Sequence, residues 1–87
     1  KFNRNNNNHK FYNTNKWRKV SKLFREQNQI CIECEKEGKV KPSQVADHII
    51  PLKQCLEKGI NPYSFDNLQA LCNHHHNKKS GKESHGL

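Results

Sequence analysis

Apolar residues recur at helical spacing soon after the N-terminus. They lie three or four residues apart, at Trp17, Val20, Leu23 and Phe24. This spacing places all of them on one side of an α-helix and leaves the charged residues on the other sides. Thr14 or Asn15 can cap the first turn with a side-chain oxygen. The pattern therefore predicts an amphipathic helix from about residue 14 to about residue 28, with one buried stripe.

The rest of the chain predicts two short strands and a second helix. Residues 45–50 form a run with β-branched residues that ends at Pro51, and residues 67–72 form a second apolar run. Residues 52–66 contain the breakers Gly59 and Pro62, and we expect a loop with one helical turn at residues 53–58. Residues 73–80 suit a helix that ends at Gly81. The predicted fold class is therefore α+β.

The two ends of the chain lack such patterns. Residues 1–10 are rich in asparagine, so we expect a disordered basic tail there, and a C-terminal tail at residues 81–87. Residues 11–80 then form a single domain. The chain has 87 residues, of which 31% are hydrophobic, so its core is small. A domain of this size needs a disulfide, a metal or a partner to stabilise it.

Positive charge is concentrated in the first third of the chain. The formal net charge is +8; residues 1–29 hold eight Lys or Arg and one acidic residue, whereas residues 30–87 hold eight Lys and seven acidic residues. A basic segment suits a polyanion, although a solubilising tail would have the same composition. The candidates for phosphate contact on the predicted helix are Arg18, Lys19, Lys22 and Arg25.

The composition also indicates a compartment. No apolar run is as long as a membrane span, and no secretory signal is visible. We therefore expect a cytoplasmic protein without a membrane partner. As a separate expectation, its partners do not include a small-molecule substrate. The four cysteines are compatible with two disulfides in a secreted protein, but cysteines near histidines in a reducing compartment more often bind metal.

Two pairs of potential ligands have the spacing of a structural zinc site. Cys31 and Cys34 form a C-x2-C pair, and Cys72 and His75 form a C-x2-H pair. Two such pairs from separate segments can close a tetrahedron around Zn²⁺. Structural zinc supplies on the order of 10 kcal/mol of folding free energy in small peptides. Cys55 has no partner at this spacing, and we expect it to be a free, half-buried thiol in a loop.

Two further segments carry residues that suit phosphodiester chemistry. Asp47 and His48 lie in ADHIIP at residues 46–51, and Asn67 and His76 lie in NLQALCNHHHNKKS at residues 67–80. In this order, interleaved with the zinc pairs, the residues resemble the HNH nuclease family, and are most like the small zinc-containing HNH proteins of bacteriophages. The resemblance extends upstream to FYN at residues 11–13 and WR at residues 17–18, so it spans about residues 11–80.

The resemblance implies a small ββα-metal fold and cleavage of DNA with one divalent cation such as Mg²⁺, Mn²⁺ or Ni²⁺. A neutral imidazole can accept a proton from water near pH 7, and a hard cation polarises the phosphate. The implied general base is His48, and the implied cation ligands are Asp47 and His76. Asn67 would orient His48 or shape the loop. The chain departs from the family pattern at His75, where the family often has a fourth zinc-binding cysteine.

The C-terminal lysines have two interpretations. Lys78 and Lys79 are candidates for holding phosphates, but they would also complement the dipole of the last predicted helix. His74 and His85 are interpreted as solvent-exposed histidines without a role in either metal site.

One geometric difficulty concerns Asp47 and His48. Neighbouring side chains of a regular strand point to opposite faces. Both residues can therefore serve one site only if the strand twists, bulges or ends there. Pro51 favours an early end.

Two other functions stay open from the sequence. A zinc-stabilised DNA-binding module without catalysis would explain the zinc pairs and the basic helix, but it would leave the Asp, His and Asn set unexplained. An accessory role beside a phage packaging motor is compatible with nuclease activity. The partners that the resemblance implies are DNA and the large subunit of a phage terminase, in the cytoplasm of a bacterial host.

Overall fold

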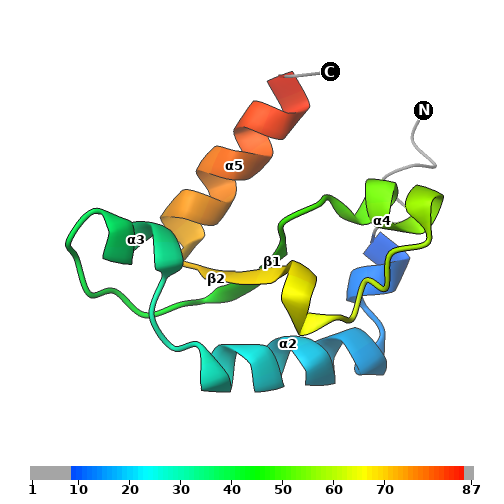
Figure 1. Cartoon of the computed structure of the whole chain (residues 1–87), viewed down its shortest axis with the longest axis horizontal. Coiled ribbons are helices and arrows are strands. Elements are labelled where there is room, and N and C mark those ends of the chain that lie inside the picture. Colours follow the sequence, from blue (N-terminus) through cyan, green and yellow to red (C-terminus); the bar gives the residue numbers. More distant parts are fainter. Residues whose placement is uncertain (1–8, 86–87) are drawn as a thin grey trace.

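Helices surround a single hairpin in the computed structural model, which describes residues 9–85, with side chains for residues 9–81. After a helical turn at residues 9–12, the chain forms α2 (Asn15–Gln27), α3 (Ile32–Lys36), β1 (Val45–His48), α4 (Leu52–Lys58), a 3-10 turn (Phe65–Asn67), β2 (Leu68–Leu71) and α5 (Asn73–His85). This mixture of helices with one small sheet confirms the predicted α+β class (Figure 1).

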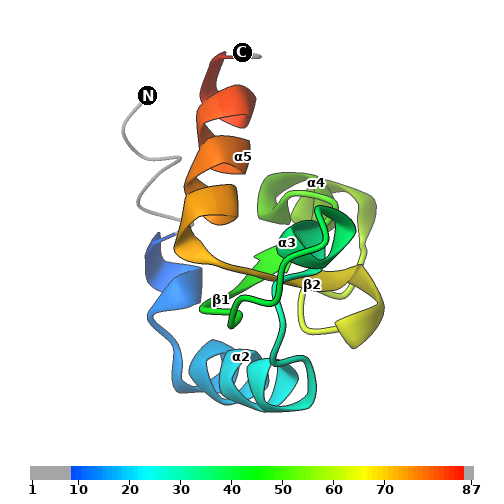
Figure 2. The same cartoon turned by 90° about the vertical axis from the view of Figure 1, so that its left-hand side faces the viewer.

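The hairpin of β1 and β2 is the centre of the molecule. The two strands are antiparallel, and Asp47 pairs with Gln69 while His48 pairs with Leu68. Helix α2 contacts one face of the hairpin, and α5 contacts both strands from the other side. Figure 2 shows the hairpin between α2 and α5, with α5 rising away from the rest of the chain. Side chains that alternate along β1 therefore face two different helices.

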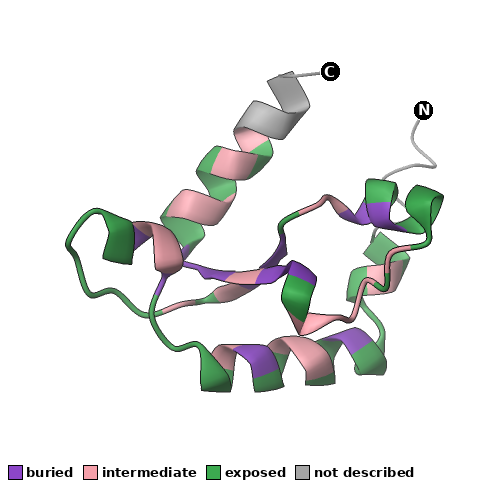
Figure 3. Ribbon diagram, viewed as in Figure 1, coloured by how far each residue is buried: buried purple, intermediate pink, exposed green. Residues whose placement is uncertain are grey.

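Helix α2 forms where the hydrophobic pattern predicted it. Thr14 is the N-cap, and its side-chain oxygen accepts a hydrogen bond of 3.2 Å from the backbone N–H of Trp17. Trp17 and Phe24 are buried against Ala46, Leu68 and Ala70 of the hairpin. Figure 3 shows this one-sided burial of α2 against the buried hairpin. The helix therefore supplies the aromatic half of the small core.

Leu23 does not belong to the buried stripe, although the spacing predicted that it would. Its exposed fraction is 49%, whereas that of Phe24 is 6%. Successive residues of a helix are rotated by about 100°, so Leu23 lies a full step away from Phe24. Trp17 and Phe24 face the hairpin, and Leu23 is left at the edge of the contact.

Three element boundaries differ from the sequence expectation. Strand β1 ends at His48 instead of Ile50, and α4 covers residues 52–58 where one turn in a loop was expected. Helix α5 continues through Gly81 to His85, because a single glycine in a helix costs only about 1 kcal/mol relative to alanine. Residues 81–85 therefore belong to α5 and not to a C-terminal tail.

The outermost residues are only partly covered by the described structure. Residues 1–8 and 86–87 lie outside the described residues, and most of the expected basic tail falls there. Residues 9 and 10, which were assigned to that tail, are helical. No helix within the described part of the chain is both long and apolar enough to cross a membrane.

Candidate active site and metal centre

The two predicted ligand pairs meet at one end of the hairpin. Cys31 caps the N-terminus of α3, which also carries Cys34; Cys72 follows β2 directly, and His75 lies in the first turn of α5. The three sulfurs and one imidazole nitrogen lie within 4.8 Å of one another, so these residues could hold a metal ion. The sequence prediction that these four residues form one cluster is therefore in accord with the folded geometry.

The edges of this cluster fit a tetrahedral ion. The sulfurs of Cys34 and Cys72 are 3.8 Å apart, and the three sulfurs lie 3.3, 3.4 and 3.7 Å from Nδ1 of His75. A tetrahedron with Zn–S bonds of about 2.3 Å and Zn–N bonds of about 2.0–2.1 Å has S···S edges of about 3.8 Å and S···N edges of about 3.5 Å. The donor set and these four of its six edges therefore fit a structural zinc site.

Protonation within the cluster is uneven. Burial and the neighbouring sulfurs of Cys31 and Cys72 raise the pKa of the Cys34 thiol to about 12. A hydrogen bond from the backbone of His75 lowers the pKa of Cys72 to about 6 despite its burial. A thiol must lose its proton to bind a metal. An ion that binds to this cluster would therefore displace the protons of the buried thiols.

Glu37 supports the fourth ligand of the cluster. The Nε2 atom of His75 lies 3.2 Å from a carboxylate oxygen of Glu37, and hydrogen bonding to His75 lowers the pKa of Glu37. A carboxylate on the outer nitrogen fixes the tautomer and leaves Nδ1 free to bind a metal. The spacing of the ligands gave no signal for Glu37, which lies beyond the C-x2-C pair and comes close only through the fold.

Cys55 takes no part in the cluster and is fully buried in α4, not half-buried in a loop as expected. All four cysteines are free, so the alternative of two disulfides is not realised. The sulfur of Cys55 donates a hydrogen bond of 3.2 Å to the carbonyl of Ile50 and lies 3.1 Å from Nδ2 of Asn67.

A second group of polar residues lies where β1 meets α5. One carboxylate oxygen of Asp47 lies 3.3 Å from Nδ1 of His76. The other oxygen accepts hydrogen bonds from Gln69, at 2.9 Å, and from Lys79, at 3.1 Å. Asp47 is only 8% exposed, so these neighbours, and not water, supply most of the polar contacts of its carboxylate. Gln69 was not predicted, and only the register that pairs it with Asp47 reveals it.

The contact between Asp47 and His76 is an ion-pair contact without the geometry of a hydrogen bond. The two atoms are within ion-pair distance, but the Nδ1 atom of His76 is buried and has no hydrogen-bond partner among the residues with described side chains. An unpaired buried nitrogen facing a carboxylate oxygen is unfavourable unless a cation or water lies between them. Asp47 and His76 could therefore hold a cation between them.

His48 is held on the other face of β1. Its Nε2 atom donates a hydrogen bond of 2.9 Å to the carbonyl of Pro62, which leaves Nδ1 with the lone pair of a neutral imidazole. The ring stacks on Trp17, with 4.9 Å between ring centroids and 22° between planes. Burial lowers the pKa of His48 below its ordinary value, which favours the neutral form.

One cleft runs beside β1 and reaches residues of both its faces. The cleft has a volume of about 530 Å³, and its lining includes Asp47, His48, His76 and Lys79. The ammonium group of Lys79 also donates a hydrogen bond of 3.1 Å to the backbone carbonyl of His48. Asp47 and His48 therefore line one cleft although their side chains point to opposite faces of β1.

Asn67 acts on the backbone beyond His48 and does not line the cleft. Its Oδ1 atom accepts a hydrogen bond of 2.8 Å from the backbone N–H of Ile50, and its Nδ2 atom donates one of 3.1 Å to the carbonyl of the same residue. The backbone carbonyl of Asn67 accepts another from Ile49, at 2.8 Å. Asn67 therefore shapes the turn that ends β1.

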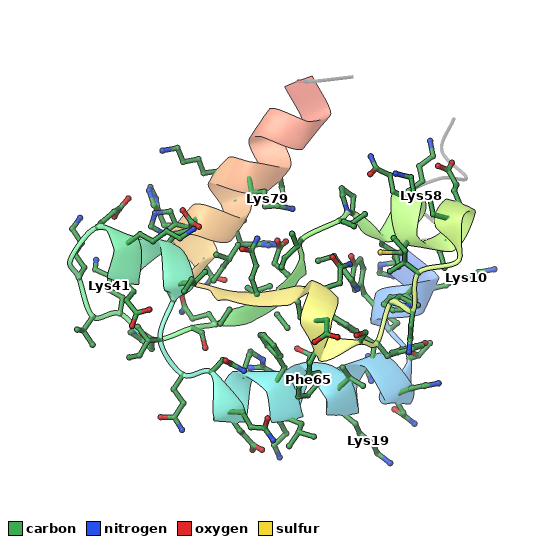
Figure 4. All side chains as sticks on the ribbon, in the orientation of Figure 1. Lys10, Lys19, Lys41, Lys58, Phe65 and Lys79 are labelled. Carbon is green, nitrogen blue, oxygen red and sulfur yellow. The ribbon has the colours of Figure 1, made fainter. Side chains whose placement is uncertain are left out.

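The predicted basic residues divide between the cleft and the outer surface. Arg25, Lys79 and the unpredicted Lys53 line the cleft. Lys78 lines a separate hollow beside Glu37 and His75. Figure 4 shows Lys79 on the side of α5 toward the hairpin and Lys19 on the side of α2 away from it. Lys53 was missed because its segment was expected to be a loop.

Comparisons with known proteins agree with this geometry. A family model described as HNH endonuclease matches residues 31–82. No curated protein matches the sequence. Among solved structures, the HNH endonuclease of the deep-sea thermophilic bacteriophage GVE2, crystallised with a manganese ion, is similar, with a TM-score of 0.78 and 30% sequence identity; the match covers 99% of this chain and 91% of that chain. This chain therefore belongs to the HNH endonuclease family.

Proposed function

We propose that the chain is a metal-dependent DNA endonuclease that uses His48 as its general base. The observation that carries this proposal is the hydrogen bonding of the His48 imidazole, in the same cleft as Asp47 and His76. Because Nε2 of His48 is bound to Pro62, the lone pair lies on Nδ1, where it can accept a proton from an attacking water. The base and the two cation ligands line the same cleft.

The residues of the cleft divide the reaction among them. His48 takes the proton of the water, and its buried ring is kept in place by Trp17 and Pro62. Asp47 and His76 would hold the divalent cation, which polarises the phosphate and stabilises the leaving oxygen when it is bound. Gln69 orients the Asp47 carboxylate. Lys79 lies beside Asp47, where its positive charge can meet a phosphate oxygen.

The two metal sites call for different ions. The sulfur-rich Cys31, Cys34, Cys72 and His75 cluster suits Zn²⁺, and its role is structural because all four ligands come from the protein. The oxygen and nitrogen ligands Asp47 and His76 suit a harder cation, such as Mg²⁺, Mn²⁺ or Ni²⁺. The GVE2 enzyme was crystallised with manganese, which makes Mn²⁺ the first ion to test.

The first test compares two aspartates. Asp47→Ala is expected to lower plasmid cleavage by roughly 10²-fold at low metal concentration, because a cation that stabilises the phosphate contributes several kcal/mol. Raising Mn²⁺ or Ni²⁺ should restore part of the activity, since His76 remains. The control is Asp66→Ala, because Asp66 is the only other aspartate and is exposed. Equal activity of the two variants in every metal would contradict the role of Asp47 as a ligand of the catalytic cation.

The DNA surface is proposed to include α2. Neutralising its four predicted phosphate contacts, Arg18, Lys19, Lys22 and Arg25, is expected to weaken DNA binding and to reduce the slope of log affinity against log salt concentration by up to about 4. The matched control removes the same number of charges elsewhere, at Lys36, Lys39, Lys41 and Lys58. If both variants lose the same slope, overall charge and not the α2 surface determines binding.

The similarity to a phage enzyme supports a further part of the proposal. We place this nuclease in phage DNA packaging, working beside the large terminase subunit in the host cytoplasm, with residues 11–80 as the nuclease domain. Its likeness over 99% of the chain to the GVE2 endonuclease supports the phage part of this assignment. The packaging and terminase part rests on the resemblance of the sequence motifs alone. Co-purification with the terminase subunit encoded in the same genome is the measurement, and absence of any association would limit the proposal to the nuclease.

A further inference from the structure

Three aromatic rings that precede or begin α2 surround His48. The ring centroids of Phe11, Tyr12 and Trp17 lie 5.9, 6.0 and 4.9 Å from that of the imidazole. All three come from the N-terminal segment, which lies outside residues 31–82, the part that matches the HNH family model. The N-terminal segment therefore completes the surroundings of the proposed base, although the HNH family model does not cover it.

We propose that Tyr12 is a positioning residue for the base. Its hydroxyl lies 3.3 Å from Nδ1 of His48, the nitrogen that carries the lone pair. The hydroxyl therefore holds this nitrogen toward the cleft until the attacking water takes its place. The inference rests on the proposed role of His48 as general base.

The two nitrogens of His48 are held from opposite sides. Nε2 donates to the carbonyl of Pro62, so Nδ1 must act as an acceptor and the hydroxyl of Tyr12 as the donor. His48 is only 3% exposed, and a buried acceptor without a partner is costly. Tyr12 supplies that partner before substrate binds, which keeps the imidazole in the orientation that the reaction needs.

The contact is suited to exchange with water. Tyr12 is 41% exposed and lines the same cleft as His48 and Asp47, so its side chain is open to water in the cleft. A separation of 3.3 Å is longer than the 2.7–2.8 Å that is usual for a hydroxyl donor. The bond is therefore weak enough to be replaced by one from water, which then lies next to the phenolic oxygen as well as the base.

The other tyrosine of the chain provides a matched control. Tyr63 stacks on Phe11, with 5.2 Å between ring centroids, and its ring lies 4.3 Å from the ammonium group of Lys16. It belongs to the same aromatic group but does not line the cleft that contains His48. Tyr63→Phe removes a hydroxyl from this group without touching the base.

The experiment compares Tyr12→Phe with Tyr63→Phe in the full chain loaded with zinc and Mn²⁺. Loss of one hydrogen bond at the base is expected to lower kcat for DNA cleavage by about two- to tenfold with KM unchanged, while Tyr63→Phe matches the wild type. A second readout needs no activity. The ¹⁵N resonance of Nδ1 of His48, in protein with labelled histidine, should move toward that of an unbonded nitrogen only in Tyr12→Phe.

The outcomes separate this inference from the proposed function. A wild-type kcat together with an unchanged ¹⁵N resonance in Tyr12→Phe would overturn the role of Tyr12. A higher kcat would also overturn it, because the hydroxyl would then be a competitor of the water. Wild-type cleavage by His48→Ala would instead contradict the role of His48 as the base, whatever the result for Tyr12→Phe.

Discussion

Replacement of His48 by alanine is expected to slow DNA cleavage by roughly 10²- to 10⁴-fold, the range for a positioned acid–base group. The substitution removes the proton acceptor on Nδ1 but none of the ligands of either metal site. Zinc content, DNA affinity and the circular dichroism spectrum should therefore stay as in the wild type. The measurement is single-turnover cleavage of supercoiled plasmid at saturating Mn²⁺. Wild-type cleavage by a folded His48→Ala protein would contradict the mechanism.

A control for this substitution is available in α5. His74 is exposed, does not line the cleft and is not part of the cysteine cluster. Its ring lies 5.1 Å from that of His75. His74→Ala is expected to cut DNA at the wild-type rate. A comparison of the two variants separates loss of the base from loss of any histidine.

The pH dependence of cleavage follows from the same residue. Burial lowers the pKa of His48 below its ordinary value of about 6.5, and only the neutral imidazole accepts a proton. The rate should therefore be constant near pH 7 and should fall as the pH drops through this lowered pKa. A rate that begins to fall above pH 7 would mean that another group controls the acidic limb.

Loss of the zinc ligands is expected to unfold the domain. Structural zinc supplies on the order of 10 kcal/mol in small peptides, which is comparable to the whole stability of a typical domain of about 5–15 kcal/mol. Cys34→Ser should therefore lose its zinc and its cooperative thermal transition. The matched control is Cys55→Ser, which should retain one zinc per chain. The Cys55 thiol is hydrogen-bonded to the carbonyl of Ile50 and lies outside the cluster. A zinc-bound, folded Cys34→Ser protein would mean that the ligands are different ones.

Much of the fold could be predicted because local patterns determine it. The stripe of Trp17, Val20 and Phe24, with Thr14 as cap, fixed the position of α2 to within a residue. The cluster of four metal ligands was recognisable because each pair lies within one short turn of chain. By contrast, the exposure of Leu23 and the extension of α5 past Gly81 depend on how the helices meet the hairpin, which no local pattern contains.

The candidate site was harder to complete than the fold. Asp47, His48, Asn67 and His76 could be named from a resemblance, but their partners could not. Gln69 reaches Asp47 through strand register, whereas Tyr12 reaches His48 across 36 positions of sequence. Such contacts are created by tertiary packing and leave no periodic signal. The alternation of a strand suggested a conflict between Asp47 and His48, but one cleft beside β1 includes both residues in its lining.

The first turn of α5 places two neighbouring histidines in two different proposed metal sites. His75 points to the cysteine cluster and His76 to Asp47, as expected for a helix that turns by about 100° per residue. Filling the cysteine cluster therefore fixes the rotation of the helix and so aims the imidazole of its neighbour. Ions in the two sites should then bind with positive cooperativity, and linkage requires that each raise the affinity for the other by the same factor.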